Sequence, residues 1–216
     1  MVDSRPGFSR RRMLRTLITA PFAWALAEHL HRVGEAVAAE ARHAAIERGT
    51  ASGVTPECGD GDEPTPRQTA GPFFTPDSPE RTSLIERGVA GTRIVLTGHV
   101  FGRGCTPLAG ALLDFWHADG DGAYDNEGYR CRGHQFADAE GRYRLVTVVP
   151  GVYPGRTRHF HVRVQPRGGR VLTTQLYFPD EPRNRRDGLF RPELLLAVDG
   201  ARTPLAARFH FVLETG

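Results

Sequence analysis

The feature that most limits what this chain can fold into is a series of six short strand-like segments between residues 92 and 214. The segments are rich in Val, Leu, Phe and Thr, and turn-forming residues such as Gly168 and Gly169 separate them. Short β-type segments divided by turn signals predict an all-β fold, and here a β-sandwich. The six segments are residues 92–102, 109–119, 141–149, 158–165, 170–178 and 207–214.

One of these segments, RHFHVRV, alternates His159 and His161 with Phe160, Val162 and Val164. Residues i and i+2 of a strand project to the same side. The apolar residues are therefore expected to face the core, and the two imidazoles to stand side by side on the other face. Such a pair either faces solvent or holds a metal ion, and the pattern alone leaves both alternatives open.

Three parts are expected along the chain. Residues 1–27 form an N-terminal targeting segment, residues 28–70 a helical arm followed by a linker, and residues 71–216 the β-sandwich. The arm is rich in Ala and Glu with scattered apolar positions, which indicates a helix or a poorly ordered segment. The linker is rich in Gly, Pro and acidic residues, which is typical of a connection between folded parts.

The N-terminal segment has the layout of a secretory signal peptide. Arg10 and Arg11 precede an apolar run that ends in the A-x-A arrangement of Ala25 and Ala27. Consecutive arginines before such a run are typical of the twin-arginine route, which exports folded proteins. The alternative is a basic amphipathic helix that stays attached, but the run is too short to span a bilayer. We therefore expect a periplasmic or extracellular protein without membrane association in its mature form, or a cytoplasmic one if this segment is not a signal.

Composition excludes several classes of function. All 28 basic residues are arginines, so the chain has neither a Schiff-base lysine nor the lysine of a phosphate-binding P-loop. Five of these arginines lie within the first 15 residues, and the rest of the chain is close to neutral, which argues against nucleic-acid binding. The three cysteines lack the spacing of a zinc ribbon. One disulfide, for example between Cys105 and Cys131, is compatible with export and would leave Cys58 over.

Two tyrosines stand where strand-like segments give way to loops. Tyr124 lies in DGDGAYDNEG and Tyr153 in VVPGVYPGRT, and the Gly and Pro residues around them shape both loops. A lone loop tyrosine is usually a rim residue, although loops also carry functional sites. Tyr129 lies five residues after Tyr124 in the same glycine-rich stretch, so a modest register change could present either ring.

A resemblance to a known family spans nearly all of the predicted sandwich, and the stretches that carry it are TAGPFF, AGALLDFWHADGDGAYDN, DAEGRYRLVTVVPGVYP, RTRHFHV, TTQLYFPDEP and RFHFVL. In this order they resemble the intradiol ring-cleavage dioxygenases, the family of protocatechuate 3,4-dioxygenase and catechol 1,2-dioxygenase. The resemblance implies a β-sandwich that holds a non-haem Fe(III) ion through four side chains, Tyr124, Tyr153, His159 and His161. Tyr124 is favoured over Tyr129 because DFWHADGDGAY continues the family's spacing.

The same resemblance implies the reaction and two further residues. A catechol-type aromatic and O2 would be the substrates, both oxygen atoms would enter between the hydroxylated carbons, and the product would be a cis,cis-muconate-type diacid. Arg156 would stabilise negative charge that develops on the ring, and Gln175 would line the pocket. Tyr153 would leave the metal when the catechol binds and accept a proton. Without the resemblance, Arg156 would be a rim arginine and Gln175 an ordinary cross-strand residue; Arg158 is the other arginine that could face the pocket.

Two tyrosines and two histidines are chemically suitable ligands for Fe(III). Fe(III) prefers anionic oxygen, and a phenolate is a strong oxygen donor once the metal lowers its usual pKa of about 10. Two tyrosinates and a hydroxide neutralise the charge of the ion. Neutral imidazoles complete the coordination, which favours the ferric state over the ferrous state of sites with two histidines and one carboxylate.

Two rival functions stay open at this point. One is an exported β-sandwich that binds a metal or ligand without dioxygenase activity. The other is a zinc hydrolase, although zinc sites more usually combine histidines with carboxylates. Three further histidines, His99, His117 and His134, are expected to be structural or exposed. Apolar stretches such as FWHAD would suit a homo-oligomer, but such stretches equally build cores.

Overall fold

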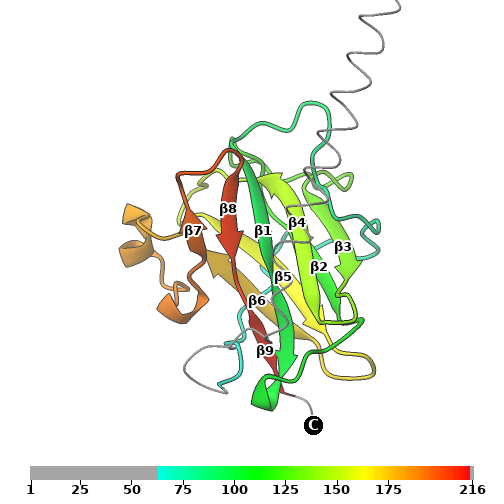
Figure 1. The fold of residues 1–216 in the computed structure, drawn as a ribbon. Helices are drawn as coiled ribbons and strands as arrows, with labels where there is room; N and C mark the ends of the chain where they lie inside the picture. The colour runs from blue at the N-terminus through cyan, green and yellow to red at the C-terminus, as the bar shows by residue number, and fades with distance from the viewer. Residues whose placement is uncertain (1–62, 215–216) are drawn as a thin grey trace, which may run out of the picture. The chain divides into compact units, whose positions relative to one another are not determined.

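A computed structural model describes residues 63–214, which form two β-sheets packed face to face (Figure 1). This part of the chain contains nine strands and three short 3-10 helices, which confirms the predicted all-β sandwich. It contains no helix long and apolar enough to cross a membrane. The predicted signal peptide, the predicted arm and most of the predicted linker lie outside the described residues.

The two sheets differ in how their strands pair. The strands are β1 (Arg93–Gly102), β2 (Leu112–Trp116), β3 (Arg132–Phe136), β4 (Arg142–Val148), β5 (His159–Gln165), β6 (Leu172–Tyr177), β7 (Ala197–Asp199), β8 (Leu205–Arg208) and β9 (Phe211–Leu213). The first sheet has the order β4-β1-β8-β7, with β9 beside the C-terminal end of β1. The second has the order β3-β2-β5-β6 and is antiparallel throughout. In the first sheet, β1 runs parallel to β8 and β9.

The alternation along β5 directs one face of this strand into the core. Phe160, Val162 and Val164 are fully buried in the cluster between the sheets, as the sequence predicts. Leu96 of β1 meets the same cluster from the opposite sheet. Burial of each such side chain contributes about 1.5–3 kcal/mol. The register of β5 is therefore strongly determined, because a slip by one residue would place the histidines in this core.

The last predicted segment, residues 207–214, covers the end of β8 and all of β9 rather than one continuous strand. β8 pairs with the first half of β1 and β9 with its end, and the chain steps between them at Phe209. The Phe209 carbonyl oxygen lies 1.7 Å from the position that a Cβ on Gly98 would take, so β1 requires glycine there. Tyr143 donates a hydrogen bond of 2.9 Å to the same carbonyl. The step depends on contacts between distant segments, and for this reason the periodicity of residues 207–214 does not reveal it.

Strands β3 and β7 are absent from the sequence prediction. The β3 sequence, RGHQF, has no apolar alternation, and its one large apolar side chain, Phe136, is 53% exposed. A charged residue, Arg132, is buried instead. β7 has only three residues. Both strands owe their conformation to pairing with a neighbour, which overrides their weak local preference.

The suggested pairing of Cys105 with Cys131 is wrong. Cys105 takes part in a disulfide, but Cys131 is a free thiol buried at the start of β3. Cys58, the third cysteine, lies outside the described residues. Burial raises the pKa of the Cys131 thiol to about 12, so this residue behaves as a small apolar side chain.

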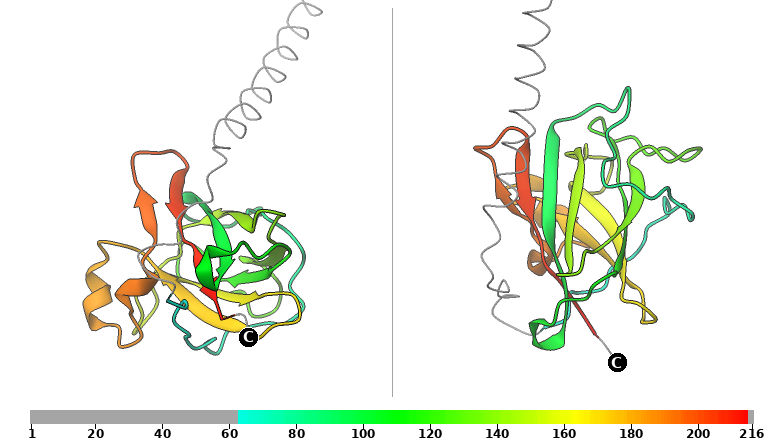
Figure 2. Two further views of the ribbon diagram at one scale, coloured as in Figure 1. Left: turned by 60° about the horizontal axis from the view of Figure 1, so that its bottom comes forward. Right: turned by 45° about the vertical axis from the view of Figure 1, so that its right-hand side comes forward.

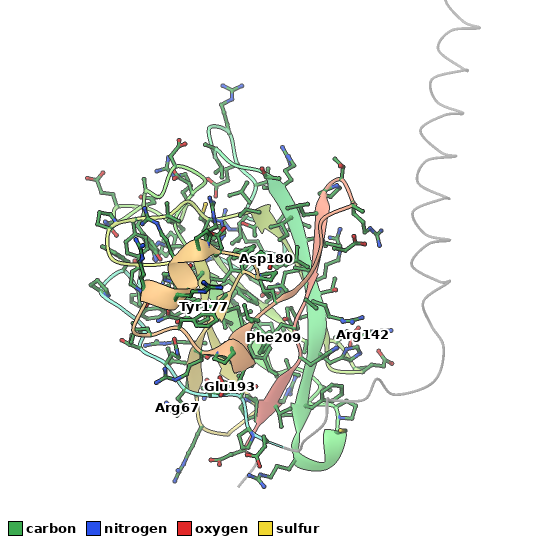
Figure 3. All side chains as sticks on the ribbon, turned by 90° about the vertical axis from the view of Figure 1, so that its left-hand side faces the viewer. Arg67, Arg142, Tyr177, Asp180, Glu193 and Phe209 are labelled. Carbon is green, nitrogen blue, oxygen red and sulfur yellow. The ribbon has the colours of Figure 1, made fainter. Side chains whose placement is uncertain are left out.

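The segment between β6 and β7 carries η2 (Pro182–Arg186) and η3 (Pro192–Leu194) and lies at one edge of the sandwich (Figure 2). Figure 3 shows this segment in front of Tyr177, the last residue of β6. The Tyr177 hydroxyl donates to the Leu189 carbonyl at 2.9 Å, and its ring packs on Phe190 with 5.3 Å between centroids. Tyr177 pairs in register with His159. The segment therefore closes over the end of the sheet at which the histidines begin.

Candidate metal centre

The histidine pair of β5 is buried on the side away from the core. His159 and His161 are 2% and 1% exposed, and their Nε2 atoms are 3.1 Å apart. The chain before β1 covers them. Gly71, with a φ of 66°, approaches His161 so closely that a Cβ would lie 3.4 Å from its Cε1 atom. This burial excludes the alternative in which the pair faces solvent.

Hydrogen bonding and stacking set the state of both rings. The Nδ1 of His159 lies 2.7 Å from the Thr157 carbonyl oxygen, which can only accept, so Nδ1 carries the proton and Nε2 keeps its lone pair. His161 stacks on Trp116 with 4.9 Å between ring centroids. Burial, followed by the Arg156 guanidinium, lowers the pKa of His159 to about 4. Burial and the neighbouring His159 also lower the pKa of His161. Both rings are thus neutral, which is the form that binds metals.

Two tyrosines converge on these rings from different loops. Tyr153 lies between β4 and β5, and its hydroxyl is 3.3 Å from the Nε2 of His159. Tyr124 lies between β2 and β3, with its ring centroid 5.6 Å from that of Tyr153 and 6.5 Å from that of His161. The Tyr124 hydroxyl is buried and has no hydrogen-bond partner among residues 63–214. The structure therefore brings together all four residues that the sequence predicts as metal ligands.

The unpartnered hydroxyl indicates what these four residues could hold. Burial, followed by the nearby Tyr153, raises the pKa of Tyr124, so the phenol stays protonated without a cation. A bound cation would stabilise the phenolate instead and supply the missing partner. Two phenolates and two neutral imidazoles suit Fe(III), a hard ion. The described part of the chain has no group of three or more His, Cys, Asp or Glu side chains arranged to bind a metal.

A buried arginine, Arg132, supports the position of Tyr124. Its Nε and Nη2 donate to the Asp125 carbonyl at 3.0 and 2.6 Å, and its Nη1 donates to the Phe73 carbonyl at 2.5 Å. Phe73 in turn stacks on Tyr124 with 4.4 Å between ring centroids. Arg132 thus holds both the residue after Tyr124 and the ring that packs on it. Sequence reasoning missed this residue because it lies in the strand without an apolar pattern.

The other tyrosine of the glycine-rich loop, Tyr129, points away from the cluster. It is 37% exposed, and its hydroxyl donates to the Pro76 carbonyl at 3.1 Å. The geometry therefore presents Tyr124 and not Tyr129 to the two histidines.

Arg156 and Gln175 border the cluster. The Nη2 of Arg156 donates to the Oε1 of Gln175 at 2.5 Å, and its Nη1 lies 3.4 Å from the Tyr153 hydroxyl. Gln175 is fully buried on β6, pairs in register with His161, and donates to the Thr69 carbonyl at 3.0 Å. The pair thus forms one polar wall beside the two tyrosines.

Arg158 does not face this cluster. Its Nη1 donates to the Pro150 carbonyl at 2.8 Å, and its Nε pairs with Glu181 at 2.5 Å. Arg158 and Glu181 line a separate cavity of about 520 Å³, next to Phe178. Of the two arginines that the sequence leaves open, Arg156 is therefore the one at the cluster.

A buried carboxylate, Asp187, lies behind Arg156 and was also missed by sequence reasoning. Its Oδ2 accepts a hydrogen bond of 2.9 Å from the Arg156 Nε. Burial alone would raise the pKa of Asp187, but hydrogen bonds from the Thr157 and Leu189 backbone and from Arg156 lower it overall. Nothing in the charged stretch PRNRRDGLF distinguishes this acid from a solvated one.

The three remaining histidines named from the sequence make contacts of their own. His117 is buried and lies 2.7 Å from the Thr147 hydroxyl. The Nδ1 of His134 lies 2.7 Å from the Ser78 carbonyl. His99 is half-buried on β1.

The sequence is similar to those of known dioxygenases. A family model described as "Dioxygenase" matches residues 69–215. The protocatechuate 3,4-dioxygenase beta chain of Burkholderia cepacia is 33% identical over 137 residues, which cover 55% of this chain and 57% of that protein. A hydroxyquinol 1,2-dioxygenase of Rhodococcus opacus is 31% identical over 159 residues, or 62% of this chain and 53% of that protein. The chain thus spans about half the length of the curated relatives it matches.

Solved structures show the same similarity. The dioxygenase domain of a dioxygenase carbohydrate-binding protein fusion from Streptomyces sp. SirexAA-E is 55% identical, with a TM-score of 0.69 over 71% of this chain and 100% of that chain. The 3-chlorocatechol 1,2-dioxygenase of Rhodococcus opacus 1CP is 29% identical, with a TM-score of 0.66 over 70% of this chain and 73% of that one.

Proposed function

Because the chain belongs to the intradiol ring-cleavage dioxygenase family, we propose that it is a non-haem, Fe(III)-dependent dioxygenase that acts on a catechol-type aromatic. Both atoms of O2 would enter between the two hydroxylated carbons, and the product would be a cis,cis-muconate-type diacid. The observation that carries the proposal is the buried convergence of two phenols and two neutral imidazoles, with the Tyr124 hydroxyl left without a protein partner.

Tyr124, Tyr153, His159 and His161 would hold the iron. When bound, Fe(III) would bind the catechol oxygens and make the ring reactive toward O2. The two phenolates would offset most of the charge of the ion, and the two imidazoles would add none. The stacking of Tyr124 on Phe73 and of His161 on Trp116 would help to keep these rings in place when the iron is bound.

Tyr153 is the ligand that we assign to proton transfer. Its hydroxyl lies 3.3 Å from the Nε2 of His159 and 3.4 Å from the Nη1 of Arg156. It comes from the β4–β5 loop and is set between Pro and Gly residues. Its phenolate oxygen would give way to the incoming catechol and accept a proton from a catechol hydroxyl.

Arg156 would stabilise negative charge on the substrate ring. Its Nε and Nη2 are held by Asp187 and Gln175, so the Nη1 donors remain for the pocket. A fixed guanidinium in a buried site needs little reorganisation as charge develops, which is the condition under which such stabilisation is large.

The names of the relatives support a catechol-type substrate without selecting one. They include catechol, chlorocatechol, hydroxyquinol and protocatechuate dioxygenases. Oxygen uptake should therefore be measured with these four compounds and with larger lignin-derived catechols. We expect one O2 consumed per catechol and a diacid product that retains both oxygen atoms. A yellow semialdehyde would show cleavage beside the hydroxyls, and iron-loaded protein that consumes no O2 with any of these catechols would favour a binding module.

We also propose that the protein is exported after folding. The support is the arginine pair Arg10 and Arg11 and the apolar run behind it, which lie outside the described residues. Export of folded protein would allow the iron to be loaded before the protein leaves the cytoplasm.

A further inference from the structure

The carboxylate of Asp187 joins the segment between β6 and β7 to residues beside the cluster. Asp187 follows η2 directly, and its side chain is 3% exposed. Its Oδ2 accepts from the Arg156 Nε and from the Thr157 backbone N–H, both at 2.9 Å. Its Oδ1 accepts from the Leu189 backbone N–H, also at 2.9 Å. One buried carboxylate thus joins the β6–β7 segment to two adjacent residues that precede β5.

The first of these contacts decides how Arg156 points. The guanidinium is planar, so a bond to its Nε fixes the plane and the direction of both terminal nitrogens. Nη2 donates a hydrogen bond of 2.5 Å to the Oε1 of Gln175. Nη1 then has only the 3.4 Å contact with the Tyr153 hydroxyl and stays available at the cluster. Without Asp187, only the bond from Nη2 to Gln175 would hold the guanidinium, which could then turn about that contact and change the direction of Nη1.

The second contact reaches His159 through the backbone. The Thr157 N–H bonds to Asp187, and the Thr157 carbonyl accepts from the Nδ1 of His159 at 2.7 Å. That bond sets the tautomer which leaves Nε2 free. Asn184 of η2 adds a separate tie, because the Thr157 hydroxyl donates to its Oδ1 at 2.7 Å. Asn184 therefore supports Thr157 by a second route, whereas Asp187 is the described acid that pairs with Arg156.

We propose that Asp187 is a positioning residue of the ring-cleavage reaction, which acts through Arg156 by fixing the direction of its guanidinium. The inference rests on the proposed function. The side chain of Asp187 bonds to Arg156, Thr157 and Leu189 and to none of the four candidate ligands. Its loss should therefore reduce turnover while substrate binding and iron content stay close to those of the wild type.

Asp187→Asn tests this with nearly the same shape. The side-chain oxygen of asparagine can still accept a hydrogen bond at one of the two carboxylate oxygen positions. At the other position its NH2 group would face an N–H donor, so the bond there is lost. We expect kcat per bound iron to fall about 10- to 100-fold, the range for misplaced catalytic groups, with KM within about threefold. Asn184→Ala is the matched control, because it loosens the same segment without touching Arg156, and its kcat per bound iron should stay within about twofold of the wild type.

A double-mutant cycle shows whether Asp187 acts through Arg156. In an Arg156→Ala background, Asp187→Asn should lower kcat by no more than about twofold, because the group it positions is gone. If the two losses multiply, Asp187 acts by another route and the inference is wrong. It is equally wrong if Asp187→Asn and Asn184→Ala lower kcat per bound iron alike.

A readout on the metal-free protein separates this inference from the proposed function. In 15N-edited NMR, the Arg156 Nε–H signal, identified by its loss in Arg156→Lys, should exchange slowly with water in the wild type. In Asp187→Asn it should exchange at least about tenfold faster. Equal exchange rates would overturn the inference even if the wild type cleaves catechols. Wild-type protein that consumes no O2 would instead refute the function and leave the NMR result to decide the positioning.

Should Asp187→Asn fail to fold, Asp187→Glu provides the second variant. It keeps the charge but moves the carboxylate by one methylene group. We expect at least about a fivefold loss of kcat per bound iron and faster exchange of the Arg156 Nε–H. Wild-type values for both would contradict the inference.

Discussion

Replacing Tyr124 with phenylalanine is expected to stabilise the metal-free protein. The Tyr124 hydroxyl is buried without a hydrogen-bond partner in the described part of the chain, whereas its ring stacks on Phe73 at 4.4 Å and would remain in the variant. An unpartnered buried hydroxyl costs about 1–3 kcal/mol. Tyr124→Phe should therefore raise the free energy of unfolding of the metal-free protein by that amount, which corresponds to a Tm increase of roughly 2–12 °C for a domain of this size.

With iron bound, the sign should reverse. The variant lacks an anionic ligand, and a binding constant about a thousandfold weaker removes about 4 kcal/mol of ligand-linked stability. Calorimetry on stripped and iron-loaded samples of the wild type and Tyr124→Phe measures both effects. Tyr129→Phe is the control, because its exposed hydroxyl bonds to the Pro76 carbonyl, and it should change stability by less than about 1 kcal/mol in either state. A Tyr124→Phe variant that is less stable than the wild type without metal would show that the hydroxyl has a protein partner, which refutes this reasoning.

Three further predictions concern the fold and export. Burial lowers the pKa of His117 from 6.5 to about 4, so its neutral form contributes stability above pH 6.5 that is lost as the pH falls through 4. Urea titrations of metal-free protein at pH 7 and pH 4 measure this loss as a fall in the free energy of unfolding. The fall should be about 3 kcal/mol smaller in His117→Gln than in the wild type, and an unchanged pH dependence would contradict this prediction. Gly98→Ala should cost more than about 3 kcal/mol in the same titration, because its Cβ would lie 1.7 Å from the Phe209 carbonyl oxygen; a tolerated alanine would argue against the step between β8 and β9. Replacing Arg10 and Arg11 with lysine should retain the precursor inside the cell in fractionation experiments, and unchanged export would remove the twin-arginine route.

The alternation in β5 allowed the sequence to place the most important strand and its two histidines. The core residues Phe160, Val162 and Val164 and the opposite face with His159 and His161 follow directly from a period of two. What periodicity could not tell is that the second face is also buried, because Gly71 and the chain around it come from a distant part of the sequence.

Residues that support the site were beyond sequence reasoning for a related reason. Arg132 and Asp187 belong to stretches that look like polar surface, and their importance arises only from contacts with the Phe73 and Asp125 carbonyls and with Arg156. Buried charges are stable only with such partners, and no local sequence pattern predicts which partners a charged residue will have. The resemblance to a family identified the residues at the centre, while the structure was needed for those around them.

Iron content and visible absorption of the purified protein test the central claim most directly, with Tyr124→Phe and Tyr129→Phe measured beside the wild type. The wild type should carry about one iron per chain and the visible absorption of a ferric tyrosinate, which zinc would not produce. Tyr124→Phe should lose most of the iron and the colour, and Tyr129→Phe should keep both. A colourless wild type after iron loading, or a Tyr129→Phe variant that bleaches while Tyr124→Phe stays coloured, would contradict the proposed metal centre.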